Sequence, residues 1–258
     1  MRRPYGKSAG YYDAFYSERV DYEGDVRFLF DVFKRHGAKK PKKLLDLGAG
    51  TCSHALLLAQ QGVEVDAVDV SEPLLDVAEE KIKDAKLGKQ VRLHRMDMTK
   101  KLPEGKFDAA VSMFGAWCYL RTDEDASKTM SMLTQRLPKG GLFVFEFWSP
   151  LGWQPQQNWT ETDLPDGTHV VRLTRPSLEL KDDVYEFEME HIAVRDGKLI
   201  DNFSEGHGLR LRTPFQTRAL LARNGFEVLA MTKGGRDAKS LEPMGPTDFR
   251  VMCIARRA

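Results

Sequence analysis

Residues 44–62 read LLDLGAGTCSHALLLAQQG, and this stretch decides the fold. A short apolar run interrupted by Asp46 leads through Gly48 and Gly50 into an Ala/Leu-rich segment, a pattern typical of strand, tight turn and helix. Glycines in such a turn allow backbone dihedrals that other residues avoid, and they let a ligand lie directly against the main chain. The stretch therefore predicts a cofactor-binding turn.

Three details indicate which cofactor binds there. A dinucleotide fingerprint needs a third glycine, but its position holds Ser53. Asp46 would repel a pyrophosphate, yet it suits a ligand that carries an ammonium and a sulfonium group. Asp69 ends a second predicted strand, residues 63–70, about 20 residues after the first glycine, where a carboxylate accepts hydrogen bonds from ribose hydroxyls. The pattern predicts S-adenosylmethionine, with cofactor contacts from Asp46, Gly48, Ala49, Gly50, Thr51, Asp69 and Val70.

The order of motifs resembles the class I S-adenosylmethionine-dependent methyltransferases: LLDLGAG, VDVS, RMDM, FDAAVSMFGAWCYL and LPKGGLFVFEF. The likeness spans residues 10–150 and resumes weakly over 205–255. It is similar in particular to small-molecule N-methyltransferases, including those that dimethylate the amine of nucleotide-linked amino sugars. These share a Tyr-Asp-x-x-Tyr element, a His after the glycine turn and a Glu-x-Trp stretch. The sequence departs from the family at Cys52, where a third glycine is usual; because Cys is small, we expect the turn to survive.

The resemblance implies further site residues. Leu74 lies where the family packs an apolar side chain on the adenine, and Asp97 and Met98 lie where the family contacts the adenine edge and ring. Tyr16 matches a tyrosine that closes the site over the methyl donor, which makes it both a cofactor contact and a catalytic candidate. His207 lies near a histidine of the related enzymes and is a candidate for contact with the substrate.

The segment after residues 107–113, a nearly continuous apolar strand, is expected to face the reaction centre, because ligands lie beyond the carboxyl ends of strands in open α/β sheets. Met113 and Phe114 are predicted to border the cofactor, and Trp117 the substrate. Tyr119 is predicted to position or deprotonate an amine, although a structural hydroxyl is an equal alternative. An amine must be neutral to react, so Tyr16, Tyr119 and His207 are the candidates for holding or accepting its proton.

From Trp148 onward the composition shifts: residues 148–159 form a loop rich in Trp, Gln and Pro, and the segments 169–175, 183–197 and 198–212 alternate between apolar and polar residues with a period of two. This alternation predicts an inserted antiparallel sheet with a hairpin turn at Asp196-Gly197. We expect the sheet to cover the active site as a lid, with substrate contacts from Trp148, Trp153 and Arg210.

The predicted fold is an α/β, Rossmann-like, seven-stranded, mostly parallel sheet with an antiparallel last strand, flanked by helices and carrying the inserted β lid. The predicted units are residues 1–147, with N-terminal helices and the cofactor-binding core, 148–212, with the lid, and 213–258, which completes the core sheet.

The composition limits the classes of molecule that the protein is expected to bind. A chain of 258 residues with 41% hydrophobic content can bury a sizeable core, and a net charge of +1 gives no electrostatic reason to bind nucleic acid or an anionic membrane. Three widely spaced cysteines argue against a disulfide framework, and no metal-ligand spacing is present. The basic N-terminus lacks an apolar signal-peptide core, so a cytoplasmic protein with a small-molecule substrate is expected. The sequence leaves a homodimer open.

Three alternatives remain at this level. An O-methyltransferase of a small acid or phenol uses the same cofactor residues. A methyltransferase of RNA or protein would carry a basic face or an Asn/Asp-Pro-Pro-Tyr type loop after the fourth strand, where this chain has Met-Phe-Gly-Ala. A dinucleotide-dependent oxidoreductase or a non-catalytic nucleotide-binding module would bind NAD(H) in place of S-adenosylmethionine.

Overall fold

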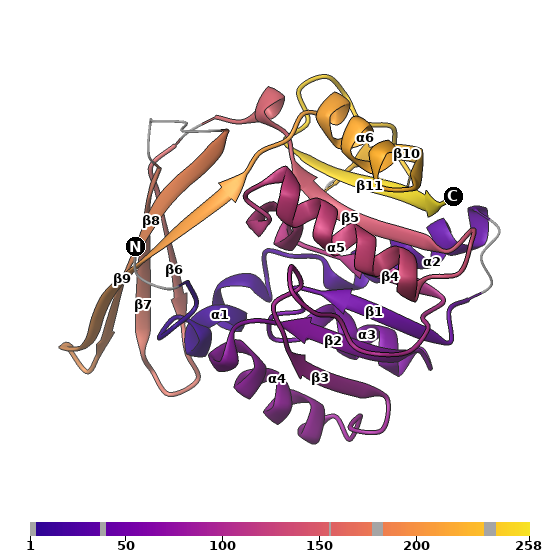
Figure 1. Ribbon diagram of the computed structural model, residues 1–258. Helices are drawn as coiled ribbons and strands as arrows, with labels where there is room; N and C mark the ends of the chain where they lie inside the picture. The colour runs from indigo at the N-terminus through magenta and orange to yellow at the C-terminus, as the bar shows by residue number, and fades with distance from the viewer. Residues whose placement is uncertain (1–3, 37–39, 155, 177–182, 235–240) are drawn as a thin grey trace.

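The structure, a computed structural model, describes residues 4–36, 40–154, 156–176, 183–234 and 241–258. These residues form a seven-stranded sheet in the order β10-β11-β5-β4-β1-β2-β3 and a separate four-stranded sheet in the order β6-β7-β8-β9 (Figure 1). The predicted fold class is confirmed.

The core sheet is parallel except at one strand. Strand β1 pairs in parallel with β2 and β4, and the pairs β2–β3 and β4–β5 are also parallel. The final strand β11 runs antiparallel to both of its neighbours, β5 and β10, as predicted. The strands are β1 Lys43–Leu47, β2 Glu64–Asp69, β3 Val91–Arg95, β4 Ala109–Ser112, β5 Leu142–Trp148, β10 Phe226–Lys233 and β11 Arg250–Arg257.

Helices cover both faces of the core sheet. Alternate residues of β5 point to opposite sides, so Phe143 and Phe145 join one buried cluster while Leu142 and Val144 join the other. Helices α5 and α6 pack in the first cluster, and α2, α3 and α4 pack in the second. Their bounds are α2 Tyr22–Arg35, α3 Ser53–Gln60, α4 Glu72–Asp84, α5 Asp123–Arg136 and α6 Pro214–Arg223.

The second sheet is an antiparallel meander to one side of the core (Figure 1). It consists of β6 Asn158–Asp163, β7 His169–Pro176, β8 Val184–Arg195 and β9 Lys198–Arg210. Asp196 and Gly197 join β8 to β9 with φ angles of 52° and 72°. Two consecutive positive φ angles are what a two-residue hairpin turn requires, so the predicted hairpin is confirmed.

Helix α1, Ala9–Tyr16, connects this sheet to the core. On the sheet side, Thr162 Oγ1 donates a 3.0 Å hydrogen bond to the carbonyl of Ala14. On the core side, Lys81 Nζ of α4 lies 2.7 Å from the Asp13 carboxylate and 3.2 Å from Thr51 Oγ1 in the glycine turn. The N-terminal helix therefore contacts both the glycine turn and the inserted sheet. The predicted division of the chain into three units, with boundaries at residues 147 and 212, stays a prediction.

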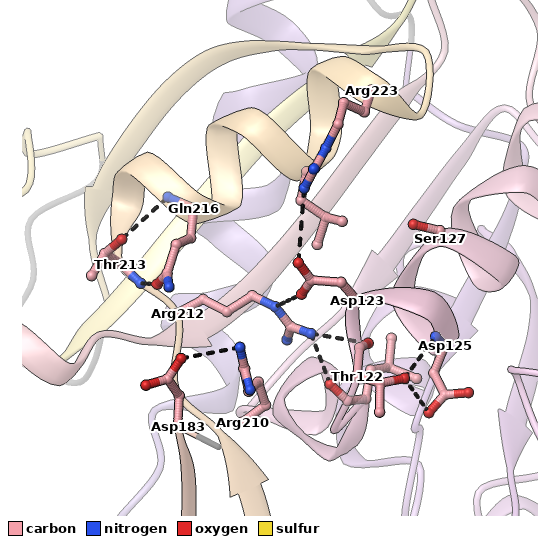
Figure 2. A network of polar contacts seen from close by, with 12 residues as sticks. Thr122, Asp123, Asp125, Ser127, Asp183, Arg210, Arg212, Thr213, Gln216 and Arg223 are labelled. Carbon is pink, nitrogen blue, oxygen red and sulfur yellow. Dashed lines mark hydrogen bonds and ion pairs between the residues drawn. The ribbon is translucent and has the colours of Figure 1, made fainter.

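A buried arginine joins the end of β9 to the core. Arg212 is 2% exposed, and its Nε donates to Asp123 Oδ1 at 3.2 Å while Nη2 donates to the carbonyl oxygens of Leu120 and Thr122 (Figure 2). Directly after it, Thr213 and Gln216 form a capping box that begins α6, because each side chain accepts from the other's backbone N–H. These contacts fix where the inserted sheet returns to the core.

Candidate active site

A cavity of about 850 Å³ lies at the carboxyl ends of the parallel strands β1, β2 and β4. This is where a ligand is expected in an open α/β sheet. Every predicted cofactor contact except Tyr16 lines this single cavity: Asp46, Gly48, Ala49, Gly50, Thr51, Asp69, Val70, Leu74, Asp97, Met98, Met113 and Phe114.

The turn after β1 forms the floor of the cavity and depends on its glycines. Gly48 has φ +73°, and a Cβ placed on it would lie 2.4 Å from the Cβ of Ala116, so only glycine fits there. Gly50 has φ +56°. Cys52 also adopts a left-handed φ of 61° and is fully buried, at a cost of about 1–2 kcal/mol in backbone energy. The turn therefore survives with cysteine at this position.

Asp69, at the end of β2, is tied to the turn and to the start of α4. One oxygen accepts from the backbone N–H of Gly50 and the other from that of Ser71, both at 2.8 Å. Burial raises the pKa of Asp69, and these backbone hydrogen bonds partly oppose the rise. Each carboxylate oxygen can accept a second hydrogen bond, so the side chain can also serve a ligand hydroxyl. Ser71 begins α4 as its N-cap, but its side chain makes no capping hydrogen bond.

Asp46 forms a buried acidic end of the cavity. It is 2% exposed, and burial raises its pKa to about 6, an effect that His54 opposes and Asp69 reinforces. His54 also lines the cavity and lies 3.0 Å through Nε2 from the carboxylate of Asp25. A buried carboxylate with a raised pKa favours a cationic ligand group, which would restore the charged form.

Residues that follow β3, together with Leu74 of α4, form another part of the cavity wall. Asp97 Oδ1 accepts hydrogen bonds from the backbone N–H and the hydroxyl of Thr99, and Lys100 Nζ lies 3.2 Å from Oδ2. These contacts outweigh burial and hold the pKa of Asp97 below its ordinary value. Leu74 is 2% exposed, and with Met98 it gives the cavity an apolar wall.

Tyrosines also line the cavity. Tyr5, Tyr12, Tyr22 and Tyr119 all border it. The Tyr119 hydroxyl lies 2.6 Å from the hydroxyl of Tyr5 and 2.7 Å from Nδ1 of His207. Burial raises the pKa of Tyr119 well above its ordinary value, so its side chain is a neutral phenol at physiological pH.

His207 connects this hydroxyl to a buried carboxylate. The imidazole is 1% exposed, stacks on Phe187 with ring centroids 4.9 Å apart, and lies 3.2 Å through Nε2 from Glu205 Oε1. Glu205 also accepts from Ser8 Oγ at 2.7 and 2.8 Å and from the backbone N–H of Tyr5 at 3.1 Å. The structure thus brings together Tyr119 and His207, two of the candidates named separately from the sequence, and places Glu205 next to His207.

Comparison with known proteins shows which enzymes the chain is similar to. Residues 44–141 match a family described as a methyltransferase domain. The chain is 27% identical over 239 residues to the dTDP-3-amino-3,4,6-trideoxy-alpha-D-glucopyranose N,N-dimethyltransferase of Streptomyces venezuelae, covering 90% of this chain and 95% of the relative. The chain therefore carries a methyltransferase domain, and along most of its length it is similar to S-adenosylmethionine-dependent methyltransferases.

Two further comparisons agree with this. The dTDP-3-amino-3,6-dideoxy-alpha-D-glucopyranose N,N-dimethyltransferase of Streptomyces fradiae is 25% identical over 231 residues, covering 89% of this chain and 87% of the relative. A crystal structure of an S-adenosylmethionine-dependent methyltransferase from Clostridium acetobutylicum superposes with a TM-score of 0.81 at 22% identity, covering 99% of this chain and all of the other. The latter shares the fold from end to end.

The residues of this methyltransferase fit S-adenosylmethionine. The cavity is lined at Gly48 by bare main chain, where a Cβ would clash with Ala116. It has a buried carboxylate at Asp46 for a cationic end and a second carboxylate at Asp69 for hydroxyls. Among the described residues no cluster of His, Cys, Asp and Glu side chains is arranged to hold a metal ion. Nor does any helix in the described part have the length and apolar character needed to cross a membrane.

Tyr16 and Trp117, two of the predicted site residues, lie outside the cavity wall. The Tyr16 hydroxyl accepts a 2.9 Å hydrogen bond from Arg172 of β7, and its ring meets the edge of Phe114 at 5.1 Å. Trp117 is 1% exposed and packs on Phe143 and Phe145 in the core. Its place in the core differs from the expected substrate contact, because the 3₁₀ helix Ala116–Tyr119 turns this side chain toward β5.

The other three predicted substrate contacts also do not line the cavity. Trp148 donates through Nε1 to Glu146 and covers Gly115, and Trp153 meets the edge of Tyr185 at 4.7 Å. Arg210 forms an ion pair with Asp183 at 3.1 Å in the junction between the inserted sheet and the core (Figure 2). Because these three side chains are aromatic or basic, we expected them to bind the substrate. In the structure they pack at this junction instead.

Sequence reasoning missed several residues of the cavity. Tyr5 and Tyr12 line it, and Glu205 supports it from behind. The signal for Tyr12 was present, since it begins the Tyr-Asp-x-x-Tyr element that ends at Tyr16. For Glu205 a weak signal existed in the alternation of β9, because residues 205 and 207 of a strand point to the same face.

Proposed function

We propose that this methyltransferase N-methylates the amine of a small molecule, an amino sugar carried on a nucleoside diphosphate. Two relatives that match along most of their length are N,N-dimethyltransferases of dTDP-linked amino sugars. The observation that carries the proposal is Tyr119, which lines the cofactor cavity and whose hydroxyl lies 2.7 Å from Nδ1 of the buried His207. Such a group can hold an amine by one N–H while the nitrogen lone pair faces the methyl donor.

When bound, S-adenosylmethionine supplies a methyl group electrophilic enough to react directly with a neutral amine. The chain therefore contributes mainly alignment and the exclusion of water. Tyr5, Tyr12 and Tyr119 would close the acceptor end of the cavity, and Met113 and Phe114 would border the reacting atoms. Tyr119 and His207 would orient the amine and receive its proton. Tyr16 would act indirectly, through its edge contact with Phe114.

The proposed donor contacts follow the chemistry of each wall. Asp46 would pair with the ammonium end, and the backbone of residues 48–51 would lie along the methionine portion. Asp69 would accept hydrogen bonds from the ribose hydroxyls, with Val70 beside it. Leu74, Asp97 and Met98 would enclose the adenine. Their common position on one cavity supports these roles.

An acceptor screen tests the proposal. The full-length chain is incubated with S-adenosylmethionine and dTDP-3-amino-sugars, matched dTDP-sugars with a hydroxyl in place of the amine, free amino sugars and simple phenols. Formation of S-adenosylhomocysteine and the mass of the product are measured. We expect turnover with the amino sugars and none with the hydroxyl counterparts. Methylation of the hydroxyl or phenol series alone would identify an O-methyltransferase and contradict the proposal.

The assembly and location of the enzyme stay predictions. A cytoplasmic location is supported by Cys52, Cys118 and Cys253, which are all unpaired and buried. A homodimer and the absence of a nucleic-acid partner rest on the sequence alone.

A further inference from the structure

We infer that Glu205 is a positioning residue for the methyl transfer: it fixes His207 in the tautomer whose Nδ1 accepts the proton of Tyr119. The role in turnover rests on the proposed N-methylation, whereas the tautomer itself is a property of the free enzyme. This residue was not among the site residues expected from the sequence.

The contacts of Glu205 define the direction of each hydrogen bond. Its side chain is 4% exposed and receives hydrogen bonds from Ser8, from the backbone of Tyr5 and from His207. Although burial alone would raise it, the pKa of Glu205 is held below its ordinary value by the His207 and Ser8 hydrogen bonds. An ionised carboxylate can only accept, so Nε2 of His207 carries a hydrogen and donates it.

The other nitrogen then has its lone pair directed at Tyr119. A neutral imidazole with hydrogen on Nε2 accepts at Nδ1, and the Tyr119 hydroxyl lies 2.7 Å away as its donor. The Tyr119 oxygen can therefore accept from the Tyr5 hydroxyl at 2.6 Å and from an amine N–H in the cavity. With the opposite tautomer, Nδ1–H would donate to Tyr119, and the phenol hydrogen would turn to the Tyr5 oxygen or to the amine, so no acceptor for the phenol proton would be left at His207.

The same arrangement provides a route for the proton that the amine loses when it is methylated. When the acceptor nitrogen takes the methyl group from the sulfonium, the carbon–sulfur bond breaks to leave the neutral thioether S-adenosylhomocysteine. The nitrogen becomes an ammonium, and one of its N–H protons passes to the Tyr119 oxygen. The original Tyr119 proton passes to Nδ1 of His207, which leaves a neutral phenol and an imidazolium beside the Glu205 carboxylate. Because burial raises the pKa of Tyr119 well above its ordinary value, this phenol needs such a partner to act as a base.

The groups around His207 favour the tautomer with hydrogen on Nε2. Glu205 faces it from β9, Tyr119 from the 3₁₀ helix after β4, and Tyr5 from the N-terminal segment, with Tyr5 and His207 ring centroids 5.0 Å apart. On β8, burial lowers the pKa of His191 to about 4, although Glu205 opposes the shift. His191 is therefore neutral at physiological pH and adds no competing positive charge.

Nitrogen NMR of the full-length chain labelled with ¹⁵N-histidine tests the tautomer without any acceptor. At mildly alkaline pH we expect His207 of the wild type to show a protonated Nε2 and an unprotonated Nδ1. In Glu205→Gln the amide cannot accept from both His207 and the Tyr5 backbone, so a mixed or reversed tautomer is expected, and Glu205→Leu removes the acceptor altogether. The exposed Glu188→Gln on β8 is the matched control and should leave the signals unchanged.

Two results would overturn the inference: hydrogen on Nδ1 of His207 in the wild type, or a wild-type tautomer that persists in both Glu205 variants. With an amine acceptor in hand, Glu205→Gln should lower kcat by at least about 10-fold and move the acidic limb of the kcat profile to lower pH, since the imidazolium loses its counter-charge. The affinity for S-adenosylhomocysteine should stay within about 2-fold, which shows an intact fold. If no amine is accepted, the proposed function fails, but the tautomer measurement still decides the role of Glu205.

Discussion

The hydroxyl of Tyr119 lies 2.7 Å from Nδ1 of His207, although 88 residues separate them in the sequence. Tyr119 ends the 3₁₀ helix after the core strand β4, whereas His207 belongs to β9 of the inserted sheet. The hydrogen bond therefore joins the core to the inserted sheet at the wall of the cofactor cavity. A shift of the inserted sheet would change the surroundings of the Tyr119 hydroxyl directly.

Replacing Tyr119 with Phe should lower kcat by roughly 10²-fold, because the phenol that holds and deprotonates the amine is lost. The affinity for S-adenosylhomocysteine, measured by calorimetry, should change little, since the hydroxyl is bonded to Tyr5 and His207. Tyr11→Phe on α1 is the control and should behave as the wild type. An unchanged kcat in Tyr119→Phe would reduce the hydroxyl to a structural role.

Replacing Gly48 with Ala should abolish donor binding, because the new Cβ would lie 2.4 Å from the Cβ of Ala116 at the cavity floor. Gly62→Ala is a matched control: its φ is +81°, but no atom lies within 4 Å of the added Cβ. Both variants should lose about 1–2 kcal/mol of stability through left-handed backbone strain, and Gly48→Ala should lose more because its Cβ also clashes with Ala116. Only Gly48→Ala should lose S-adenosylhomocysteine binding by calorimetry, and equal binding by both would contradict the assignment of the floor.

Replacing Asp69 with Ala should weaken S-adenosylhomocysteine binding by about 10- to 100-fold, which corresponds to the loss of hydrogen bonds to a charged group. The variant also removes the acceptor for the Gly50 N–H, so the glycine turn loses support. Asp76→Ala, an exposed carboxylate on α4, is the control for charge. Unchanged affinity in Asp69→Ala would show that the ribose contact is wrongly assigned.

The raised pKa of Asp46 predicts two dependences on pH. Between the ordinary value near 3.8 and about 6, the folded protein keeps a proton that the unfolded chain has released. The free energy of unfolding of the unliganded protein should therefore fall, relative to Asp46→Asn, as pH rises through this window, and the difference should be constant above it. Chemical denaturation of both proteins at several pH values measures this difference.

Donor affinity should follow the opposite trend. A cationic ammonium end favours ionised Asp46, so S-adenosylhomocysteine should bind more tightly as pH rises through about 6, by up to 10-fold per pH unit below it. In Asp46→Asn this part of the pH dependence should disappear. A wild-type affinity that is flat from about pH 5 to about pH 7 would show that Asp46 does not pair with the ligand.

The part of the site that is proposed to bind the methyl donor could be predicted, because the sequence signals for it are local. The turn at Gly48 and Gly50, Asp46 before it and Asp69 at the end of the next strand are each set by short-range backbone requirements and by the ends of parallel strands. Those strands are recognisable from their apolar runs, and their carboxyl ends necessarily meet at one edge of the sheet. The α/β class followed from the same patterns, whereas the antiparallel last strand was implied by the family resemblance.

The part of the site that is proposed to hold the methyl acceptor depends on tertiary structure. Tyr5, Tyr119 and Glu205 come from three distant segments, and only the docking of the inserted sheet and the N-terminal segment on the core brings them within hydrogen-bonding reach. Tertiary packing also buried Trp117 against β5 in the core, and the pairing of β8 with β9 placed Arg210 beside Asp183. Periodicity tells which face of an element is apolar, but it does not tell which other element covers that face. The partners of a polar side chain depend on that choice, and so does the chemistry they can perform.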